Sequence, residues 1–565
     1  MDNSAAALFE DGVLIAAVEE ERLSRKKNDG QFPVNAIREV LSIAKITISD
    51  VDEICVYWKP WNFFPRAIST IKKILFAPRN IFILLNRIVE VFFRISSDRN
   101  THGSWADLFK IKKTISKNIG DFNGRVTYVD HHLSHQLYAE SMRDWNEFIS
   151  VSIDGGGEEF STVINVVKNG LRTKISHHKW PNSMGHFYST FTGFLGFKML
   201  EGEYKMMGLA PYGNPKYKEL ILNNILILKP GGKYKLNTSI CDYHAALQNR
   251  FNPNLEKLFG PKRKSNEKPT QDHIDLAASV QAAYEEALFH ILKPAIEKYS
   301  KIRRLVISGG CALNVTANGK LLSNGIFDEI IIPPAPHDAG CAIGACLPRI
   351  KHLDVASVRS PYLGRIFSDR DMENALKKNS ITTYSKLNDE DLVLQTAKLL
   401  SEKKIVAWFQ GRAEFGPRAL GNRSYLADPR QDAIRDDINQ KIKKRELFRP
   451  FAPSIAVDDA NKYFASIHES PYMNIVSDVT TTTIPAVTHV DNTARVHTVA
   501  REANPLYYSL IKEFGRHTGV PVLLNTSFNI QEPIVYSPDD AINTFIASEV
   551  DVLVLGPFLI ERCKL

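Results

Sequence analysis

FISVSIDGGGEEFSTVINVVKNGLRTKIS, residues 148–176, holds the clearest strand and turn pattern in the chain and indicates the fold class. Residues 148–153 form an apolar run that leads into Asp-Gly-Gly-Gly at 154–157, which predicts a buried strand followed by a tight turn. Residues 161–176 predict a hairpin, because the Asn-Gly pair at 169–170 suits a type I′ turn. We therefore expect a strand, a glycine turn and a hairpin in succession.

The same strand and glycine-turn pattern recurs further along the chain. Residues 305–308 predict a strand that leads into a glycine pair at 309–310 and then into a helix from about residue 314. Residues 329–332 predict another strand, and a second alternation of strands and helices begins at about residue 404. This alternation predicts an α/β protein.

The composition is that of a globular protein. The chain has 565 residues, 44% of them hydrophobic, with 71 basic and 63 acidic side chains. This excludes a disordered or collagen-like chain, and the length predicts three or four folding units at roughly 150 residues each. The six cysteines include no CxxC pair, which favours a reduced, cytoplasmic location over a disulfide framework. We expect no signal peptide, and no membrane span in the most apolar stretch, 81–93, because Arg87 and Glu90 interrupt it.

The net charge of +8 is concentrated in one segment. Residues 59–117 contain twelve basic and three acidic side chains, so the rest of the chain is close to neutral. Within this segment, residues 66–95 predict a basic stripe beside an apolar one. We interpret 59–117 as an insertion that forms an amphipathic helical pair packed on the main domain. The alternative is contact with a membrane surface or a polyanionic acceptor.

A second basic cluster lies at residues 410–450, which hold ten basic and six acidic side chains. Its arginines are interleaved with glycine, proline and phenylalanine, a composition unlike that of a solvated helix face. Arginines held on such turns suit bidentate recognition of phosphate. Further on, the predicted strand 521–524 leads into the polar set 525–529, at the end of a strand where α/β sheets bind ligands.

His131 and His135 follow a predicted strand at 125–129 and lie four residues apart. In a helix this spacing places both imidazoles on one face, as a shared metal ion requires. Asp154 and Asp338 each follow a predicted strand, and together the four side chains make a mixed nitrogen and oxygen donor set suited to iron(II), manganese or zinc. The alternative for the histidines alone is a surface or capping role.

The glycine turns after two of these strands are candidate phosphate cradles. Gly155, Gly156, Gly309 and Gly310 present backbone N–H groups, and Asn314 stands at the start of the next predicted helix. The alternative is that each is only a tight turn. No GxxxxGK[ST] motif is present, so a P-loop enzyme is excluded as the simple explanation.

Eight motifs span nearly the whole chain: DHHLSH (130–135), DGGGE (154–158), EGEYKMMGLAPYG (201–213), SGGCALN (308–314), PPAPHDAGCAIGA (333–345), GRAEFGPRALGNRS (411–424), FRPFAPS (448–454) and LLNTSFN (523–529). In this order and combination they resemble the NodU/CmcH family of O-carbamoyltransferases. The resemblance implies that residues 1–350, with the insertion 59–117, form a two-lobed domain of the ASKHA type, the fold of actin and sugar kinases. Residues 351–371 would be a linker, and residues 372–565 a YrdC-like α/β domain.

The resemblance also implies ATP-dependent carbamoyl transfer. The YrdC-like domain would join the carbamoyl group of carbamoyl phosphate to ATP, with Mg²⁺, as carbamoyl-adenylate. The ASKHA-type domain would then pass this group to a hydroxyl of a sugar or natural product. We expect no nucleic-acid partner, and a homodimer is possible.

The same resemblance assigns roles to individual residues. In the YrdC-like domain, the residues expected to bind ATP and carbamoyl phosphate are Arg418, Arg423, Ser424, Lys443, Arg449, Asn525 and Ser527. In the first domain, the metal ligands would be His131, His135, Asp154 and Asp338, with iron(II) or another divalent transition metal as the cofactor. The residues expected to act in catalysis are Arg418, Lys443, Arg449 and Asp338.

Two other functions stay open at this point. One is transfer of a threonylcarbamoyl group to tRNA, for which similar domains are used, although fusion of both domains in one chain favours a small-molecule acceptor. The other is a non-catalytic nucleotide-binding protein. Members of the family open with a strand and a His-Asp-x-Ser-Ala turn, whereas this sequence begins at that turn with Met1, so we expect a start recorded too late or a missing first strand.

Overall fold

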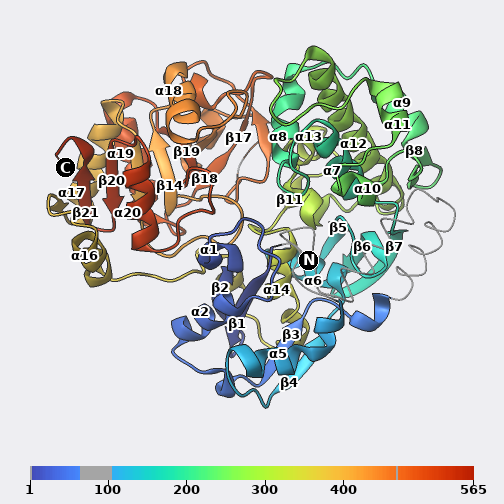
Figure 1. Ribbon diagram of the computed structural model, residues 1–565, viewed down its shortest axis with the longest axis horizontal. Helices are drawn as coiled ribbons and strands as arrows, with labels where there is room; N and C mark the ends of the chain where they lie inside the picture. Colours follow the sequence, from blue (N-terminus) through green and yellow to red (C-terminus); the bar gives the residue numbers. More distant parts are fainter. Residues whose placement is uncertain (1–2, 64–104, 466, 468, 565) are drawn as a thin grey trace. The chain divides into compact units, whose positions relative to one another are not determined.

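The computed structural model describes residues 3–63, 105–465, 467 and 469–564 (Figure 1). The chain divides into two compact units, both of mixed α/β structure. Unit 1 comprises Met1–Val13 and Asn28–Val355, and unit 2 comprises Leu14–Lys27 and Ala356–Leu565.

A five-stranded sheet forms the centre of unit 1. Its strands are β5 (Glu147–Ile153), β6 (Phe160–Lys168), β7 (Leu171–Lys179), β10 (Arg304–Ser308) and β11 (Glu329–Ile331). Their order is β11-β10-β5-β6-β7, with β10 parallel to both neighbours and β5, β6 and β7 in an antiparallel meander. The predicted strands and hairpin are confirmed, and Asn169 and Gly170 have φ angles of 48° and 78°, as a type I′ turn requires.

The direction of the strands decides where the chemistry of unit 1 gathers. β5, β10 and β11 are parallel, so their carboxyl ends lie at one edge of the sheet. Asp154 follows β5 directly, Gly309 follows β10 directly, and Asp338 comes soon after β11. Residues far apart in the chain are thereby brought to the same edge.

Helices flank this sheet. α6 (His131–Glu140) contacts β5, β10 and α14 (Cys341–Gly344), while the long helix α12 (Gln271–Lys298) contacts α7 (Met184–Phe194), α8 (Glu203–Leu209), α9 (Lys218–Asn224) and α13 (Val315–Ser323). The remaining helices and strands of unit 1 are β1 (Ala5–Glu10), α2 (Val34–Ala44), β3 (Glu53–Val56), α5 (Ile111–Asn118), β4 (Arg125–Tyr128), β8 (Leu226–Lys229), β9 (Lys233–Leu236), α10 (Tyr243–Leu247) and α11 (Pro253–Phe259). No helix among the described residues is both long and apolar enough to cross a membrane.

The predicted insertion 59–117 is described only at its two ends. The predicted amphipathic helical pair at 66–95 lies outside the described residues, and so does the predicted membrane contact. At the far end, Ile111 and Ile115 of α5 pack with Trp58 and Phe122 in a small hydrophobic core beside the parallel pair β3 and β4. The described end of the insertion at 105–117 therefore contributes to the core of unit 1.

An eight-stranded sheet forms the centre of unit 2, in the order β12-β21-β20-β13-β14-β19-β15-β18. Its strands are β12 (Ser385–Lys386), β13 (Val406–Phe409), β14 (Arg423–Ala427), β15 (Ala452–Ala456), β18 (His497–Val499), β19 (Val522–Ser527), β20 (Val552–Leu555) and β21 (Phe558–Glu561). The other helices and strands of this unit are β2 (Val13–Glu19), α1 (Glu20–Ser24), α15 (Val355–Arg359), α16 (Asp369–Lys378), α17 (Asp389–Ser401), α18 (Asp432–Asp437), β16 (Val476–Asp478), β17 (Thr493–Arg495), α19 (Pro505–Thr518) and α20 (Pro538–Ala547).

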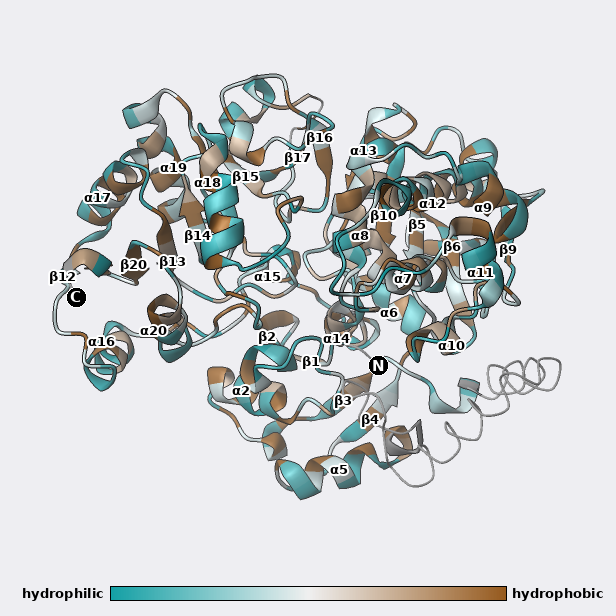
Figure 2. Ribbon diagram, turned by 45° about the horizontal axis from the view of Figure 1, so that its top comes forward, coloured by the Kyte–Doolittle hydropathy of each residue, from teal (hydrophilic) through white to brown (hydrophobic). Residues whose placement is uncertain are grey.

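Hydrophobic residues on the central strands hold the helices of unit 2 in place, and Figure 2 shows these strands as largely hydrophobic. α17 and α19 pack against each other, and Leu510 and Phe514 of α19 share one buried cluster with Trp408 of β13 and Val554 of β20. β19 continues to Ser527, beyond the strand end expected at residue 524, so Asn525 and Ser527 lie within the strand and not after it.

The segment Leu14–Lys27 belongs to unit 2, although it was expected within the first domain. Its hydrogen bonds explain the assignment: Ala17 donates its backbone N–H to the Leu363 carbonyl at 3.2 Å, and the buried Arg22 donates to the Gly416 carbonyl at 2.6 Å. The segment 351–371, expected as a linker, contains α15 and the start of α16. Each compact unit thus combines two stretches that are distant in the sequence. The expected linker is partly helical.

The packing of α19 yields a test of the core. Replacing the fully buried Phe514 with Ala should lower the free energy of unfolding by about 3–5 kcal/mol, because it leaves a cavity between the helix and the sheet. Urea unfolding would measure the loss. Ile546→Ala on α20 is the control: its side chain is 52% exposed, so the expected change is within about 0.5 kcal/mol. Equal losses in the two variants would contradict this account of the core.

Candidate metal centre and cationic cluster

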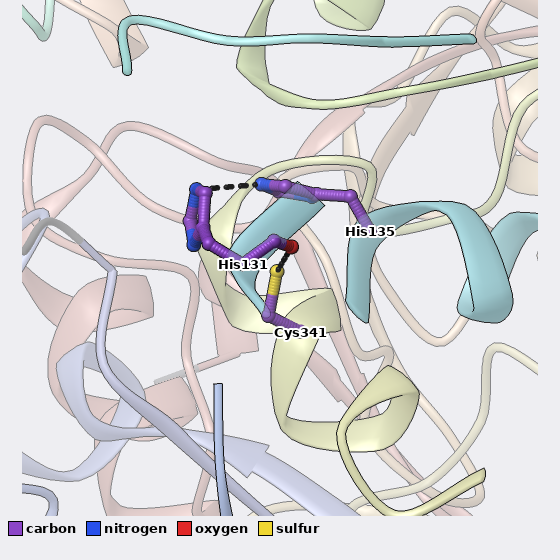
Figure 3. A group of neighbouring side chains, drawn as sticks. All are labelled: His131, His135 and Cys341. Atoms are coloured by element: carbon purple, nitrogen blue, oxygen red, sulfur yellow. Dashed lines mark hydrogen bonds between the residues drawn. The ribbon is translucent and has the colours of Figure 1, made fainter. Parts of the chain in front are cut away.

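The two histidines come from the first turns of α6. The helix begins at His131, and the Asp130 carboxylate caps it by accepting a hydrogen bond from the Leu133 N–H at 2.9 Å. His131 is fully buried and His135 is 2% exposed. Their Nε2 atoms are 3.2 Å apart, so the spacing of four places both imidazoles at one point, as the sequence predicts (Figure 3).

The two predicted carboxylates reach the same point from the edge of the sheet. Asp154 Oδ2 is 3.3 Å from His131 Nε2, and Asp338 Oδ1 is 3.7 Å from His131 Nε2 and 3.6 Å from His135 Nε2. One donor atom from each of the four residues lies within 4.8 Å of the others. Two nitrogen and two oxygen donors this close together could hold a metal ion.

The electrostatics of the cluster favour a cation. Burial lowers the pKa of His131, but the charges of Asp338 and Asp154 outweigh burial and raise this pKa to about 9. Burial raises the pKa of Asp154, but the hydrogen bond to His131 and the charge of His135 hold it well below its usual range. Two carboxylates thus stabilise positive charge at the imidazoles, and a divalent cation could take the place of the proton. The donor set therefore fits a metal ion.

Cys341 is a nearby donor that the sequence did not single out. Its thiol is fully buried on α14, lies 4.0 Å from the His131 carbonyl oxygen, and could join His131 and His135 in a second donor group (Figure 3). Burial, together with the charges of Asp338 and Asp154, raises the pKa of this thiol well above its usual range. The protonated thiol donates to the carbonyl, so Cys341 supports the start of α6.

The predicted glycine turns close around Asp154. The Gly310 N–H donates to Asp154 Oδ1 at 3.0 Å, and the Gly156 N–H lies 3.3 Å from Asp154 Oδ2. Gly309 has a φ of 88°, and a Cβ there would lie 2.1 Å from the Ile153 carbonyl oxygen, so only glycine fits. These turns therefore fix the Asp154 carboxylate, and the role of Gly155, Gly156, Gly309 and Gly310 in binding phosphate stays a prediction.

Asn314 has internal partners for its side chain. It caps α13 by accepting a hydrogen bond from the Ala317 N–H at 3.1 Å and exchanges hydrogen bonds with Gln281 at 2.9 and 3.0 Å. The side chain is 8% exposed. The structure thus gives Asn314 a clear role in fixing α13 against α12, and its predicted contact with phosphate is untested.

In unit 2, four arginines gather in one cluster: Arg418, Arg445, Arg449 and Arg495, with Glu446 paired to Arg449 at 3.7 Å. Burial and the charges of Arg418, Arg445 and Arg449 hold the pKa of Arg495 well below its usual range. The Nε atom of Arg495 is buried and has no hydrogen-bond partner among the residues that the structure describes. The sequence reasoning missed Arg495, which lies on β17 far from the basic run at 410–450. Several arginines held this close together are suited to a phosphorylated ligand.

Lys443 is buried beside this cluster. Its Nζ donates to Asn529 Oδ1 at 2.7 Å and to the Asn529 and Ser527 carbonyls. Burial, and then the charges of Arg445 and Arg449, lower its pKa well below the usual range. Of the predicted residues, Arg418, Lys443 and Arg449 thus lie in one electrostatically coupled group.

The other predicted residues of unit 2 hold loops in place; Arg423, Ser424 and Asn525 are fully buried, and Ser527 is partly buried. Arg423 stacks on Phe409 at 3.5 Å and donates to the Gln410 and Gly411 carbonyls, while Asn525 donates to the Ala419 carbonyl at 3.1 Å. Ser424 and Ser527 face each other in register on β14 and β19, and the Ser424 hydroxyl accepts from the Gly421 N–H at 3.2 Å. The geometry therefore gives these side chains a role in shaping the loop that carries Arg418.

Family models match most of the chain. A model described as carbamoyltransferase N-terminus matches residues 1–347, and one described as carbamoyltransferase C-terminus matches residues 397–562.

Several curated proteins are similar to this chain. An uncharacterised protein of Synechocystis is 39% identical over 99% of this chain and 95% of its own length. Nodulation protein NolNO of Sinorhizobium fredii is 38% identical over 100% of this chain and 79% of its own length. The 3′-hydroxymethylcephem-O-carbamoyltransferase of Amycolatopsis lactamdurans is 36% identical over 46% of this chain and 49% of its own. Among solved structures, T. kodakarensis HypF covers 45% of this chain and 40% of its own at 16% identity, but its TM-score of 0.23 is too low to support an argument.

The arginine cluster predicts opposite effects on stability and on anion binding. Arg495→Met should raise the free energy of unfolding of the ligand-free protein by about 0.5–2 kcal/mol, because one of four crowded cations is removed. The same variant should lose most of the stabilisation that inorganic pyrophosphate gives the wild type. Thermal unfolding with and without pyrophosphate measures both effects. Arg516→Met, whose side chain is 78% exposed, is the control and should behave like the wild type. A ligand-free Arg495→Met protein less stable than the wild type would contradict the role of the cluster.

Proposed function

The chain belongs to the carbamoyltransferase family, and from this premise we propose that it is an ATP-dependent O-carbamoyltransferase. The observation that supports the proposal is the presence of two chemically different sites in one chain. A cationic cluster in unit 2 suits polyanionic substrates, and a buried nitrogen and oxygen donor set in unit 1 suits a metal ion. Two such sites are what a reaction in two steps, activation and transfer, requires.

The proposed first step takes place at the cationic cluster. Carbamoyl phosphate and the triphosphate of ATP, with Mg²⁺, are both polyanions, so positive side chains must offset their repulsion when they meet. Arg418, Lys443 and Arg449 would bind and orient them, and Arg495 would add a fourth contact. Arg423, Ser424, Asn525 and Ser527 would keep the surrounding strands and loop in position. Carbamoyl phosphate would be cleaved by water to carbamate and inorganic phosphate, and a carbamate oxygen would then attack the α-phosphorus of ATP. The products of this step are carbamoyl-adenylate, inorganic phosphate and pyrophosphate.

The proposed second step takes place at the donor set of unit 1. His131, His135, Asp154 and Asp338 would hold iron(II) or another divalent transition metal. When bound, such a metal supplies Lewis-acid polarisation of an oxygen atom. The glycine turns at 155–156 and 309–310 would hold the phosphate of the adenylate near the Asp154 carboxylate, and the start of α13 at Asn314 would line the same region.

The acceptor in this proposal is a hydroxyl group of a sugar or natural product. One similar protein is named as an O-carbamoyltransferase for a hydroxymethylcephem, and nodulation proteins are similar over all or most of this chain. The hydroxyl oxygen would bond to the carbamoyl carbon, AMP would leave, and the hydroxyl proton would be released. A cytoplasmic location, a homodimer and membrane contact through 59–117 stay predictions of the sequence.

Two variants separate the proposed steps. Arg449→Ala should lower ATP- and carbamoyl-phosphate-dependent release of pyrophosphate by about 10²–10³-fold, because it removes a cation from the activation site. His131→Ala should leave pyrophosphate release close to that of the wild type and abolish formation of the O-carbamoyl product. Pyrophosphate release and product formation are measured separately on the same preparations.

Exposed Arg516→Ala serves as the control and should retain both steps. Equal loss of both steps in His131→Ala would overturn the assignment of the steps to two sites. Nucleotide binding by the wild type without pyrophosphate release under any condition would favour a non-catalytic nucleotide-binding protein. Transfer to tRNA but not to a small hydroxyl compound would favour the threonylcarbamoyl reaction.

A further inference from the structure

Glu158 is a buried carboxylate that the proposed reaction does not use. It ends the motif DGGGE in the turn between β5 and β6 and is 2% exposed. Its Oε1 accepts a hydrogen bond from the Lys59 backbone N–H at 2.8 Å, and both of its oxygens lie 3.3 Å from the His131 backbone nitrogen. No lysine or arginine side chain of the described residues forms an ion pair with it. A buried carboxylate is costly unless it is compensated, and here the charge of His131 and these backbone N–H groups offset part of the cost.

The partners of Glu158 lie on different elements of unit 1. His131 is the first residue of α6, the helix that carries both predicted histidine ligands. Glu158 itself follows Asp154 by four residues, in the turn that carries a third ligand. Lys59 lies three residues after the end of β3, where the basic segment 59–117 begins. One carboxylate thus connects the helix, the turn and the segment after β3.

The side chain of His131 lacks the support that metal-binding histidines usually have. Such a histidine normally donates its second ring N–H to a carboxylate, a carbonyl or water, which fixes the orientation of the ring. His131 Nδ1 is buried and has no hydrogen-bond partner among the described residues. The ring is instead covered by Trp58, with the ring centroids 4.5 Å apart and an angle of 30° between the planes.

The position of Trp58 depends on its neighbour. Trp58 is 4% exposed and directly precedes Lys59, whose backbone N–H is held by Glu158. Glu158 therefore contacts His131 directly, at the His131 backbone N–H. It also affects the His131 ring indirectly, because it holds the segment that positions the Trp58 ring.

We infer that Glu158 is a positioning residue of the metal centre, which sets the orientation of His131 by holding the start of α6 and the Trp58–Lys59 segment together. The inference rests on the proposed metal-binding function of unit 1. It also gives the basic segment a fixed starting point, because the chain enters that segment from a residue bonded to the wall of the metal centre. Substitutions at Glu158 should therefore change both the affinity of the site for a metal ion and the protection of the Lys59 amide from exchange.

The first experiment needs no metal. Amide hydrogen exchange is measured on the metal-free full chain, in peptides that cover residues 57–60 and 130–133. Glu158→Leu fills the same space without an acceptor, so both peptides should exchange at least tenfold faster than in the wild type. Glu158→Gln keeps an oxygen at the position of Oε1 and should restore protection. Unchanged exchange in Glu158→Leu would overturn the inference.

The second experiment measures binding of Co²⁺ by titration, followed by its visible absorption. Glu158→Leu should bind Co²⁺ about 10–100-fold more weakly, as is usual when a residue that orients a metal ligand is lost. Glu158→Gln should stay within about threefold of the wild type on the same scale. If Glu158→Gln binds as weakly as Glu158→Leu, the negative charge and not the hydrogen bonds supports the metal, and the positioning role is wrong.

A neighbouring glutamate supplies the control. Glu159 lies beside Glu158 in the sequence but pairs with Lys179 at 2.6 Å at the surface, so Glu159→Leu should match the wild type in both experiments. If the wild type binds no Co²⁺ while Glu158 still protects the two amides, the proposed metal function fails and the positioning role stands. If the amides do not depend on Glu158, the inference fails whatever the metal affinity.

Discussion

The attraction between two buried imidazoles and two carboxylates sets the architecture of unit 1. Bringing Asp154 and Asp338 to within 3.3–3.7 Å of the histidines requires the ends of β5 and β11 to meet at one edge, with β10 between them. It also requires the first turn of α6 to point at that edge. Carboxylates alone would repel each other there, so the donor set is stable only with a shared positive charge, either protons or a metal ion.

Unit 2 presents the opposite electrostatic problem. Its arginines repel one another, and burial adds to the cost, as the lowered pKa values of Arg495 and Lys443 indicate. Neutral neighbours offset part of this cost: Lys443 has amide and carbonyl acceptors, and Arg445 bonds to Asn439 Oδ1 at 2.6 Å. These uncharged acceptors hold Lys443 and Arg445 in place without neutralising them, while Glu446 pairs with Arg449 at 3.7 Å.

Most of the correct predictions from the sequence rest on local patterns. The strands before Asp154 and Gly309, the Asn-Gly hairpin and the helix spacing of His131 and His135 depend on residues close together in the chain, and the structure has all of them. Neither Arg495 nor Glu158, although Glu158 ends the DGGGE motif, was given a role from the sequence, because their importance comes from partners distant in the chain. No periodicity or turn signal marks a lone arginine on β17 or a carboxylate bonded to two backbone N–H groups.

The inclusion of Leu14–Lys27 in unit 2 has a consequence for folding during synthesis. Unit 2 contains residues from near the beginning of the chain as well as its final 210 residues, Ala356–Leu565. On the ribosome, the early segment emerges long before its hydrogen-bonding partners Leu363 and Gly416 exist. The hydrogen bonds that join this segment to the rest of unit 2 therefore cannot form until almost all of unit 1 has been synthesised. Cutting the gene between the two units would separate this segment from its partners, so the halves are expected to need each other to fold.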